Sequence, residues 1–435
     1  MKSTKVVIVG AGSADFGPGM LADVLANPEF RGSTLSLVDT DEQRLSLVKA
    51  LAIRMNEEWG TGVKVEATTD RRRAFPESEF VLVAIEVERM KRWRMDFEVA
   101  FEHGLRQPFS ENGGPGGFAH AARNIALVTG ICKDMRELCP DAWFFNYTNP
   151  VPRVTLAAFK YGGVKAAGFC HGIGIAYENV SKLLDIPEED LDIKAAGLNH
   201  FTWILDVRRQ STGDDLYPAL RAKANDWPEG FLPLTRDLLE ITDWYPVCSD
   251  SHIAEYLQWM CDPQTEPWKK YKLNPPHLGR RADGTERREK TQELTDMAEG
   301  QRAIDEYREG SGERAVATLV AIVKNSNSYE LAINIPNEGY IPNLPHNAIV
   351  EVPALVSAIG IRGLPMGDLP EPVGELCRRQ VAIAELAVKA AATGDRKAAL
   401  YALLMDPMVT DIEQGKGILD DYLKVHGDLL PQFSR

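Results

Sequence analysis

Short apolar runs alternate with helical patterns from residue 6 to residue 168, and no other feature constrains the fold as strongly. Runs with the composition of strands lie at 6–9, 35–38, 63–67, 80–84, 143–146 and 164–168. Helical patterns lie between them at 17–27, 41–58 and 121–138. This alternation is typical of a parallel sheet joined by crossover helices. We therefore expect an α/β fold whose N-terminal part is a doubly wound parallel sheet.

The pattern changes after about residue 196. Residues 201–207 alternate between polar and apolar side chains, which predicts an antiparallel strand, and helical patterns follow at 288–307, 313–324, 374–404 and 415–425. Residues 265–285 are rich in Pro, Gly, Lys and Arg and are expected to form a loop. These patterns predict a Rossmann-like domain at 1–196 and an α+β domain at 197–435, with a ligand crevice between them.

Composition excludes some classes of partner. The net charge of −14 argues against nucleic acid, which binds clustered Lys and Arg, and against an anionic membrane surface. The N-terminus lacks the pattern of a secretory signal, and no run reaches the length of about 18 apolar residues that a membrane span needs. The six cysteines have no disulfide-type spacing. We therefore expect a cytoplasmic protein with reduced thiols.

The first predicted strand leads into the turn Gly10-Ala11-Gly12-Ser13, which suits a dinucleotide. Two early glycines let the backbone approach a pyrophosphate, and the next helix can direct its N-terminal amides at that charge. Asp39, after the second strand, can accept hydrogen bonds from the adenine ribose and so favours NAD over NADP. Asp or Phe stands where the full fingerprint has its third glycine, so an ordinary β–α turn stays an alternative.

Polar residues that could bind a metal follow two of the predicted strands. Cys170 and the segment Asn146 to Pro150 each come directly after a strand, and strand ends of a parallel sheet meet at the ligand crevice. His200 lies in the segment Gly197-Leu198-Asn199-His200-Phe201. Thiolate and imidazole suit transition metals, and two protein ligands leave positions open for substrate. A buried thiol and a structural histidine are the alternative interpretation.

Acidic and phenolic side chains supply candidates for general acid–base chemistry. Glu111 lies in the glycine-rich segment 110–117, where backbone can come close to a ligand. Asp250 lies in Cys248-Ser249-Asp250-Ser251-His252, with Glu255 and Tyr256 just beyond. A carboxylate or phenol in a closed site can serve as a general base, whereas an exposed or helix-capping acid is the alternative.

Taken together and in this order, these segments resemble glycoside hydrolase family 4. The matching elements are GAGS at 10–13, ENGGPGGF at 111–118, NYTNP at 146–150, CHG at 170–172, GLNHF at 197–201 and NIPNEGYIPNLP at 334–345. The family is an NAD-dependent exception to glycoside hydrolysis by two carboxylates. The resemblance implies a fold like that of lactate and malate dehydrogenases and a small-molecule glycoside as substrate. It also implies a homodimer or homotetramer.

The resemblance also implies a mechanism with NAD and a divalent metal such as Mn²⁺. Hydride leaves sugar C3, the metal polarises the resulting ketone, a base removes the C2 proton, and the C1 leaving group is eliminated. Water adds at C1 and the hydride returns. Cys170 and His200 match the metal ligands, Asn149 matches a residue that contacts the substrate, and Glu111 matches an acid of the same pocket.

The residue after the metal cysteine varies with substrate class in this family. His171 and Gly172 here resemble the branch that acts on non-phosphorylated α-glycosides, and the Cys-His-Gly form resembles α-glucuronidases. His171 is then expected to contact the substrate and to protonate the leaving group. Asp250 is the first candidate for the base and Tyr256 the second. An Arg is expected to bind the uronate carboxylate, but the sequence does not identify it.

Other functions stay open at this point. α-Galacturonidase, α-galactosidase and α-glucosidase are alternatives within the same family. An NAD-dependent hydroxy-acid dehydrogenase would need a catalytic His paired with a carboxylate, a substrate-binding Arg and no metal, so resistance to a chelator would distinguish it. A catalytically silent NAD sensor is a third class. Its metal ligands could be lost freely, and the complete set of polar loop residues argues against it.

Overall fold

The computed structural model describes residues 1–13, 17–273 and 285–434. Six parallel strands form the N-terminal part of its sheet, in the order β3-β2-β1-β4-β5-β6. They are β1 (Lys5–Val9), β2 (Thr34–Val38), β3 (Lys64–Thr68), β4 (Phe80–Val83), β5 (Trp143–Asn146) and β6 (Lys165–Gly168). This order is that of a doubly wound dinucleotide-binding sheet, so the prediction of a Rossmann-like fold is confirmed.

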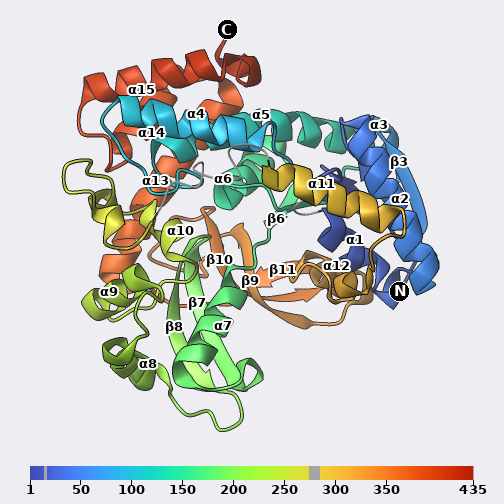
Figure 1. The fold of residues 1–435 in the computed structure, drawn as a ribbon, viewed down its shortest axis with the longest axis horizontal. Helices are drawn as coiled ribbons and strands as arrows, with labels where there is room; N and C mark the ends of the chain where they lie inside the picture. The colour runs from blue at the N-terminus through green and yellow to red at the C-terminus, as the bar shows by residue number, and fades with distance from the viewer. Residues whose placement is uncertain (14–16, 274–284, 435) are drawn as a thin grey trace.

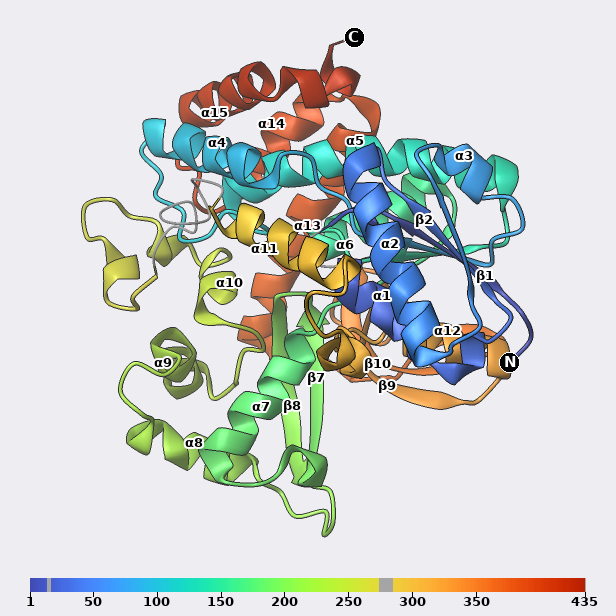
Figure 2. The same cartoon turned by 45° about the vertical axis from the view of Figure 1, so that its right-hand side comes forward.

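Helices cover both faces of these parallel strands (Figures 1 and 2). On β1, Val6 and Ile8 pack into a core with α1 and α2, whereas Val7 and Val9 pack into a second core with α4 and α5. Successive side chains of a strand point to opposite faces, so one apolar strand supplies both cores. The helices up to this point of the chain are α1 (Gly17–Leu25), α2 (Glu42–Trp59), α3 (Arg71–Ala74), α4 (Arg89–Glu102), α5 (Gly114–Leu138) and α6 (Val151–Leu156).

The sheet continues into the C-terminal half through antiparallel pairs. β9 pairs with β6, β10 with β9, β7 with β10, and β8 with β7, while β11 pairs with β10. The predicted domain boundary between residues 196 and 197 falls within β7, so the hairpin of β7 and β8 carries the sheet across it. These strands are β7 (Leu191–Leu198), β8 (Phe201–Arg209), β9 (Ser328–Pro336), β10 (Ile349–Ser357) and β11 (Gly360–Gly363).

The second half of the chain supplies the remaining helices, some around the hairpin and some on the N-terminal part. A third apolar core joins α7, α8 and α9 to β7 and β8, while α13, α14 and α15 pack into the core of α4 and α5. The helices are α7 (Gly172–Leu184), α8 (Tyr217–Lys223), α9 (Pro233–Thr242), α10 (Asp250–Ala254), α11 (Thr285–Ala298), α12 (Ala315–Lys324), α13 (Glu371–Thr393), α14 (Arg396–Met405) and α15 (Ile412–Val425). Among the described residues, none of these helices has the length and apolar composition that a membrane crossing requires.

Two predicted helices differ from the structure. The pattern at 374–404 is two helices, α13 and α14, because the chain turns at Gly394, where φ is +75° and a Cβ would lie 2.0 Å from the Gln432 carbonyl oxygen. The pattern at 288–307 gives α11 and then a separate short turn at Asp305–Glu309. Of the loop predicted at 265–285, residues 274–284 lie outside the described residues.

Candidate functional site

The turn after β1 has the geometry that a dinucleotide requires. Gly10 has a φ of +87°, and a Cβ there would lie 2.0 Å from the Ala84 carbonyl oxygen. The Gly12 amide donates to Asp39 Oδ2 at 2.8 Å, and a Cβ on Gly12 would meet that same oxygen at 2.8 Å. Asp39 therefore fixes the turn from the end of β2. The Ser13 amide donates to the Gly10 carbonyl at 3.2 Å, and the third fingerprint position, Asp15 or Phe16, lies outside the described residues.

Cys170 and His200 lie together at the carboxyl edge of the sheet. Cys170 follows β6, His200 lies in the turn between β7 and β8, and Cys170 Sγ is 3.4 Å from His200 Nε2. Two such donors on one ion, with bonds of about 2.0–2.3 Å, are about 3.0–3.6 Å apart at angles of 90–110°. The pair therefore fits one divalent ion. Burial lowers the pKa of His200 well below its ordinary value and so favours the neutral imidazole that binds metals.

Asn199 joins this pair to a buried carboxylate. Its side-chain amide lies within hydrogen-bonding reach of Cys170 and donates to Glu351 Oε2 at 2.7 Å. Glu351 is 2% exposed and also accepts hydrogen bonds from Thr202 and Asn334. Burial raises the pKa of the Cys170 thiol well above its ordinary value, and the nearby carboxylates of Glu313 and Glu351 raise it further. A bound cation would lower the pKa of the Cys170 thiol, because a cysteine binds a metal ion as the thiolate.

Glu255 holds the glycine-rich loop against His200. One carboxylate oxygen accepts the backbone N–H groups of Glu111, Asn112 and Gly113, at 2.6, 2.6 and 3.1 Å. The other accepts from the Asn112 amide at 3.1 Å, and that amide lies 2.9 Å from His200 Nδ1. The His200 ring is therefore positioned by a loop that lies more than 80 residues earlier in the chain.

Glu111 is buried in the same cluster and pairs with Arg89. Burial alone would raise the pKa of Glu111, but the guanidinium of Arg89 lowers it to about 2. Arg89 also pairs with Glu86, which contacts His120, so a partly buried ionic network adjoins Glu111. Glu111 is therefore an ionised carboxylate in the site at neutral pH.

His171 and Asn149 lie at the ends of β6 and β5. The His171 side chain is 59% exposed, and its Nδ1 lies 3.0 Å from Glu313 Oε1. This contact raises the pKa of His171. Asn149 accepts a hydrogen bond from Asn124 at its backbone carbonyl, whereas its side-chain Oδ1 is buried and has no partner. An unpaired buried oxygen at a strand end is available to a substrate hydroxyl.

The structure places the two candidate bases differently. Both oxygens of Asp250 are engaged at the start of α9, where they accept from the Leu234 amide at 2.8 Å and from the Thr235 amide and hydroxyl at 2.9 and 2.7 Å. Burial raises its pKa. Tyr256 stacks on Phe201, and its hydroxyl lies 3.4 Å from the Asn199 carbonyl oxygen, next to His200. Tyr256 thus lies beside the turn that carries His200, whereas Asp250 is turned toward α9.

The chain matches the models of two parts of one family. Residues 5–186 match "Family 4 glycosyl hydrolase" and residues 195–409 match "Family 4 glycosyl hydrolase C-terminal domain". The chain belongs to glycoside hydrolase family 4. This confirms the resemblance found in the sequence motifs, and with it the assignment of the chain as a glycoside hydrolase.

Curated members of family 4 align over nearly the whole chain. An α-glucosidase of Erwinia rhapontici is 31% identical, covering 93% of this chain and 94% of its own length. An α-galactosidase of Rhizobium meliloti (strain 1021) is also 31% identical, covering 100% of this chain and 90% of its own length. An α-galacturonidase of Bacillus subtilis (strain 168) is 27% identical over 97% of both.

Solved structures agree with the fold. The putative glucosidase lplD of Bacillus subtilis superposes with a TM-score of 0.86 at 26% identity, over 97% of this chain and 100% of that one. A 6-phospho-α-glucosidase from gut microorganisms, solved with NAD and Mn²⁺, gives 0.83 at 24% identity, over 99% and 100%. Malate dehydrogenase of Cryptosporidium parvum gives 0.53 at 15%, over 89% and 99%, which supports the predicted dehydrogenase-like fold.

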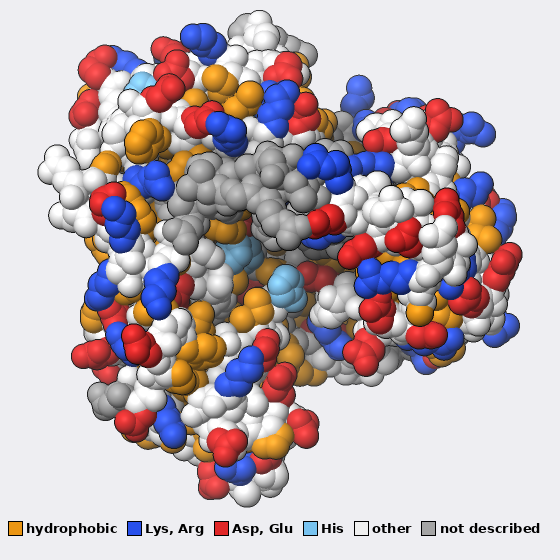
Figure 3. All heavy atoms as spheres, viewed as in Figure 1, with side chains coloured by type: hydrophobic (Ala, Val, Ile, Leu, Met, Phe, Trp, Pro, Cys, Tyr) orange, Lys and Arg blue, Asp and Glu red, His pale blue; other side chains and the backbone are white. Residues whose placement is uncertain are grey.

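Sequence reasoning did not assign several residues of this family 4 site. Asn112, Glu255 and His252 contact or surround His200, and Glu313 contacts His171. In the segment 248–252, only the Cys and the His could have been recognised from sequence as candidates for this site, because those residue types bind metals. Figure 3 shows histidine side chains in the hollow at the middle of one face.

Proposed function

We propose that the protein hydrolyses α-glycosides of uronic acids, as an α-glucuronidase, with NAD and a divalent metal as cofactors. The observation that carries the glycosidase assignment is the 3.4 Å pair of Cys170 and His200, at the same sheet edge as the turn of Gly10 and Gly12. The choice of a uronic acid rests on the sequence Cys170-His171-Gly172 and on α-galacturonidases among the relatives.

The residues of the site have different roles in this reaction. When bound, NAD⁺ supplies a hydride acceptor and the divalent ion supplies a Lewis acid. Gly10, Gly12 and Asp39 hold the dinucleotide, with Ser13 at the same turn. Cys170 and His200 hold the ion and leave positions for the substrate oxygens.

Three further side chains act on the sugar in this proposal. Asn149 binds a hydroxyl through its unpaired Oδ1. His171, exposed beside the metal ligand, donates a proton to the leaving group. Asp250 removes the C2 proton after its carboxylate has moved away from α9. Burial makes this carboxylate more basic than that of an ordinary Asp. Tyr256 is the alternative base.

Neutral α-hexosides are the second candidate substrates. The α-glucosidase and α-galactosidase relatives, each 31% identical, favour them. The neutral glucoside differs from the glucuronide only in the group on sugar C5, and the galactoside differs also in the configuration at C4, so one experiment with matched substrates separates them.

The test is hydrolysis of p-nitrophenyl α-D-glucuronide in D₂O with NAD⁺ and Mn²⁺. We expect release of nitrophenol that requires both cofactors, and deuterium at C2 of the product. Cys170→Ser should lose the release and the deuterium incorporation. Cys132→Ser should keep them, because its thiol is buried in another core. Release from the galacturonide or the neutral glycosides instead would change the proposed substrate but would still support the proposed mechanism. Steady NADH formation without cleavage would show a dehydrogenase.

A further inference from the structure

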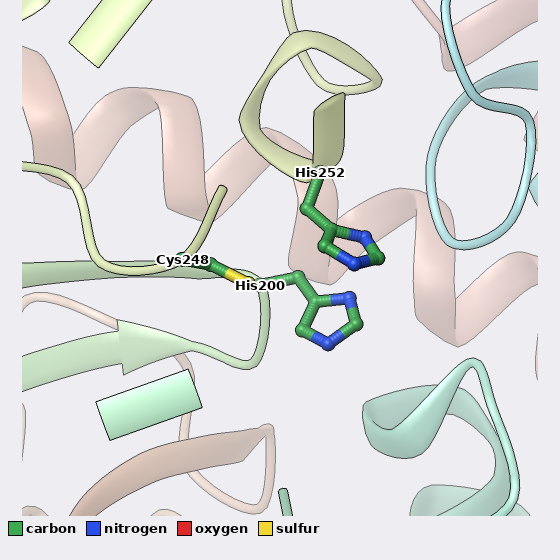
Figure 4. A group of neighbouring side chains, drawn as sticks. All are labelled: His200, Cys248 and His252. Carbon is green, nitrogen blue, oxygen red and sulfur yellow. The ribbon is translucent and has the colours of Figure 1, made fainter. Parts of the chain in front are cut away.

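A second group of metal-binding side chains adjoins the Cys170–His200 pair. Within the described part of the chain, one donor atom each of His200, Cys248 and His252 lie within 4.8 Å of one another. Figure 4 shows the sulfur of Cys248 directed toward His200, and the ring of His252 over that of His200. The two ring centres are 4.0 Å apart. Cys248 and His200 are buried, and His252 is partly buried.

Carboxylates close the other side of this group. Donor atoms of Glu111 and Glu255 also lie within 4.8 Å of those of His200 and His252. His252 Nδ1 is 3.5 Å from Glu255 Oε1 and 3.8 Å from Glu111 Oε2. That nitrogen is buried and has no hydrogen-bond partner. The two imidazoles are therefore common to two groups of donors, one completed by the Cys248 thiol and the other by the two carboxylates.

This set of donors has the chemistry of a zinc site. Zn²⁺ prefers four ligands drawn from thiolate, imidazole and carboxylate, and in divalent-metal competition it exceeds Mn²⁺ at nitrogen and sulfur ligands. Donors on one tetrahedral ion are about 3.3–3.6 Å apart, so the group has to close by about 1 Å, which side-chain rotation can supply. A purely structural packing of two rings and a thiol would not explain why the buried His252 Nδ1 lacks a partner.

We propose that His200, Cys248 and His252 form a zinc-binding site, with the carboxylates of Glu111 and Glu255 beside its two imidazoles. The site shares His200 with the Cys170–His200 pair. An imidazole bound to one cation is a poor ligand for a second, because the two charges repel each other. Zinc in this site therefore excludes the other divalent ion and inhibits the enzyme, and this last consequence rests on the proposed function.

Binding of Zn²⁺ to the purified full-length protein tests the site without any activity assay. Equilibrium dialysis is compared for the parent protein, Cys248→Ser, Cys170→Ser and Cys261→Ser, whose thiol is buried against Met408. We expect Cys248→Ser to weaken zinc binding at least about 10-fold, as loss of a ligand should, and Cys170→Ser and Cys261→Ser to retain it. Equal affinity in Cys248→Ser, or complete loss in Cys170→Ser, would overturn the proposal.

Cobalt gives a second readout on the same proteins. Co²⁺ bound by Cys248 shows a thiolate-to-metal charge-transfer band in Cys170→Ser, where the other nearby thiol is absent. Adding Cys248→Ser to that variant should remove the band, and His252→Gln should weaken binding while keeping the thiolate signal. A band that survives in the double variant would contradict the assignment of Cys248 as a ligand.

The inhibitory consequence is measured on each variant's own Mn²⁺-supported rate. We expect the zinc concentration for half inhibition to rise at least about 10-fold in Cys248→Ser. If zinc binding depends on Cys248 but the protein has no glycosidase activity, the zinc site is supported and the proposed function is refuted. If the protein has glycosidase activity and Cys248→Ser does not change its inhibition by zinc, the proposed function is supported and the zinc site is refuted.

Discussion

The carboxylate of Glu255 and the imidazole of His200 are linked through a single amide group, that of Asn112. The amide nitrogen lies 3.1 Å from Glu255 Oε1 and 2.9 Å from His200 Nδ1. The second oxygen of the same carboxylate accepts three backbone N–H groups of the glycine-rich loop. Groups that bind the far side of a metal-ligating His fix its orientation and tune its affinity. Glu255 thus links the position of the loop to that of the His200 ring.

Replacing Glu255 by Ala should affect both stability and metal binding. Three buried N–H groups lose their acceptor, so the free energy of unfolding should fall by about 3 kcal/mol or more. Metal affinity should fall about 10- to 100-fold. Denaturant unfolding and equilibrium dialysis measure the two effects, with Glu98→Ala, on the surface of α4, as the control. An unchanged metal affinity would show that Glu255 only holds the loop.

Asp39 should determine cofactor affinity. Its Oδ2 fixes the Gly12 amide, and in the bound state it is expected to accept from the adenine ribose. Asp39→Ala removes both interactions, so the Kd for NAD⁺ should rise at least about 10-fold. Titration of tryptophan fluorescence with NAD⁺ and with NADP⁺ measures this, with the exposed Glu57→Gln on α2 as the control. A smaller loss for NAD⁺ than for NADP⁺ would contradict the role of Asp39 in choosing NAD.

The sequence was sufficient for the parallel sheet because most of its strands are short apolar runs between polar turns. All six parallel strands lie within a residue or two of their predicted positions, including β3, which is partly exposed. α5 begins at Gly114 rather than at 121, because a run of glycines looks like a loop in sequence. In the structure Gly116 and Gly117 pack so closely on Ser110 and Asn112 that a Cβ would not fit.

The site was only partly predictable from sequence for a different physical reason. Cys170 follows a strand, and the position of a strand end in a parallel sheet can be inferred. Glu255 contacts Glu111 and Asn112, which lie 144 and 143 residues away, and no local pattern encodes such a contact. Glu313 reaches His171 in the same way from the segment before α12. Tertiary contacts of this kind appear only once the chain is folded.

Asp250→Asn tests whether this carboxylate is a base as well as a cap. The variant loses an acceptor at the start of α9, so the free energy of unfolding should fall by about 1–2 kcal/mol. Deuterium incorporation at C2 should also be lost. Thr235→Val is the matched control, because it removes only the hydroxyl bond to Asp250 and should retain the exchange. Exchange that persists in Asp250→Asn and disappears in Tyr256→Phe would assign the base to Tyr256.

Asp406 should make the protein less stable as the pH rises through the mildly acidic range. Its side chain is 2% exposed, Oδ1 accepts the Met408 amide, and the Gly114 amide also lies within hydrogen-bonding reach of the carboxylate. Burial raises the pKa of this carboxyl from 3.8 to about 6. Between these two values the folded protein keeps a proton that the unfolded chain has lost, so stability falls as pH rises. The loss between pH 4 and pH 7 should be about 2.4 kcal/mol.

Asp406→Asn should remove this part of the pH dependence, because the amide does not titrate. The difference in unfolding free energy between variant and parent should therefore shift in favour of the variant by about 2.4 kcal/mol from pH 4 to pH 7. Any constant cost of the unpaired amide cancels in that shift. Asp428→Asn gives a control of opposite sign, since the hydrogen bonds from Arg92 lower the pKa of Asp428 and its stabilising effect is lost as pH falls. A difference for Asp406→Asn that stays constant across this range would mean that Asp406 is ionised in the folded protein at pH 4.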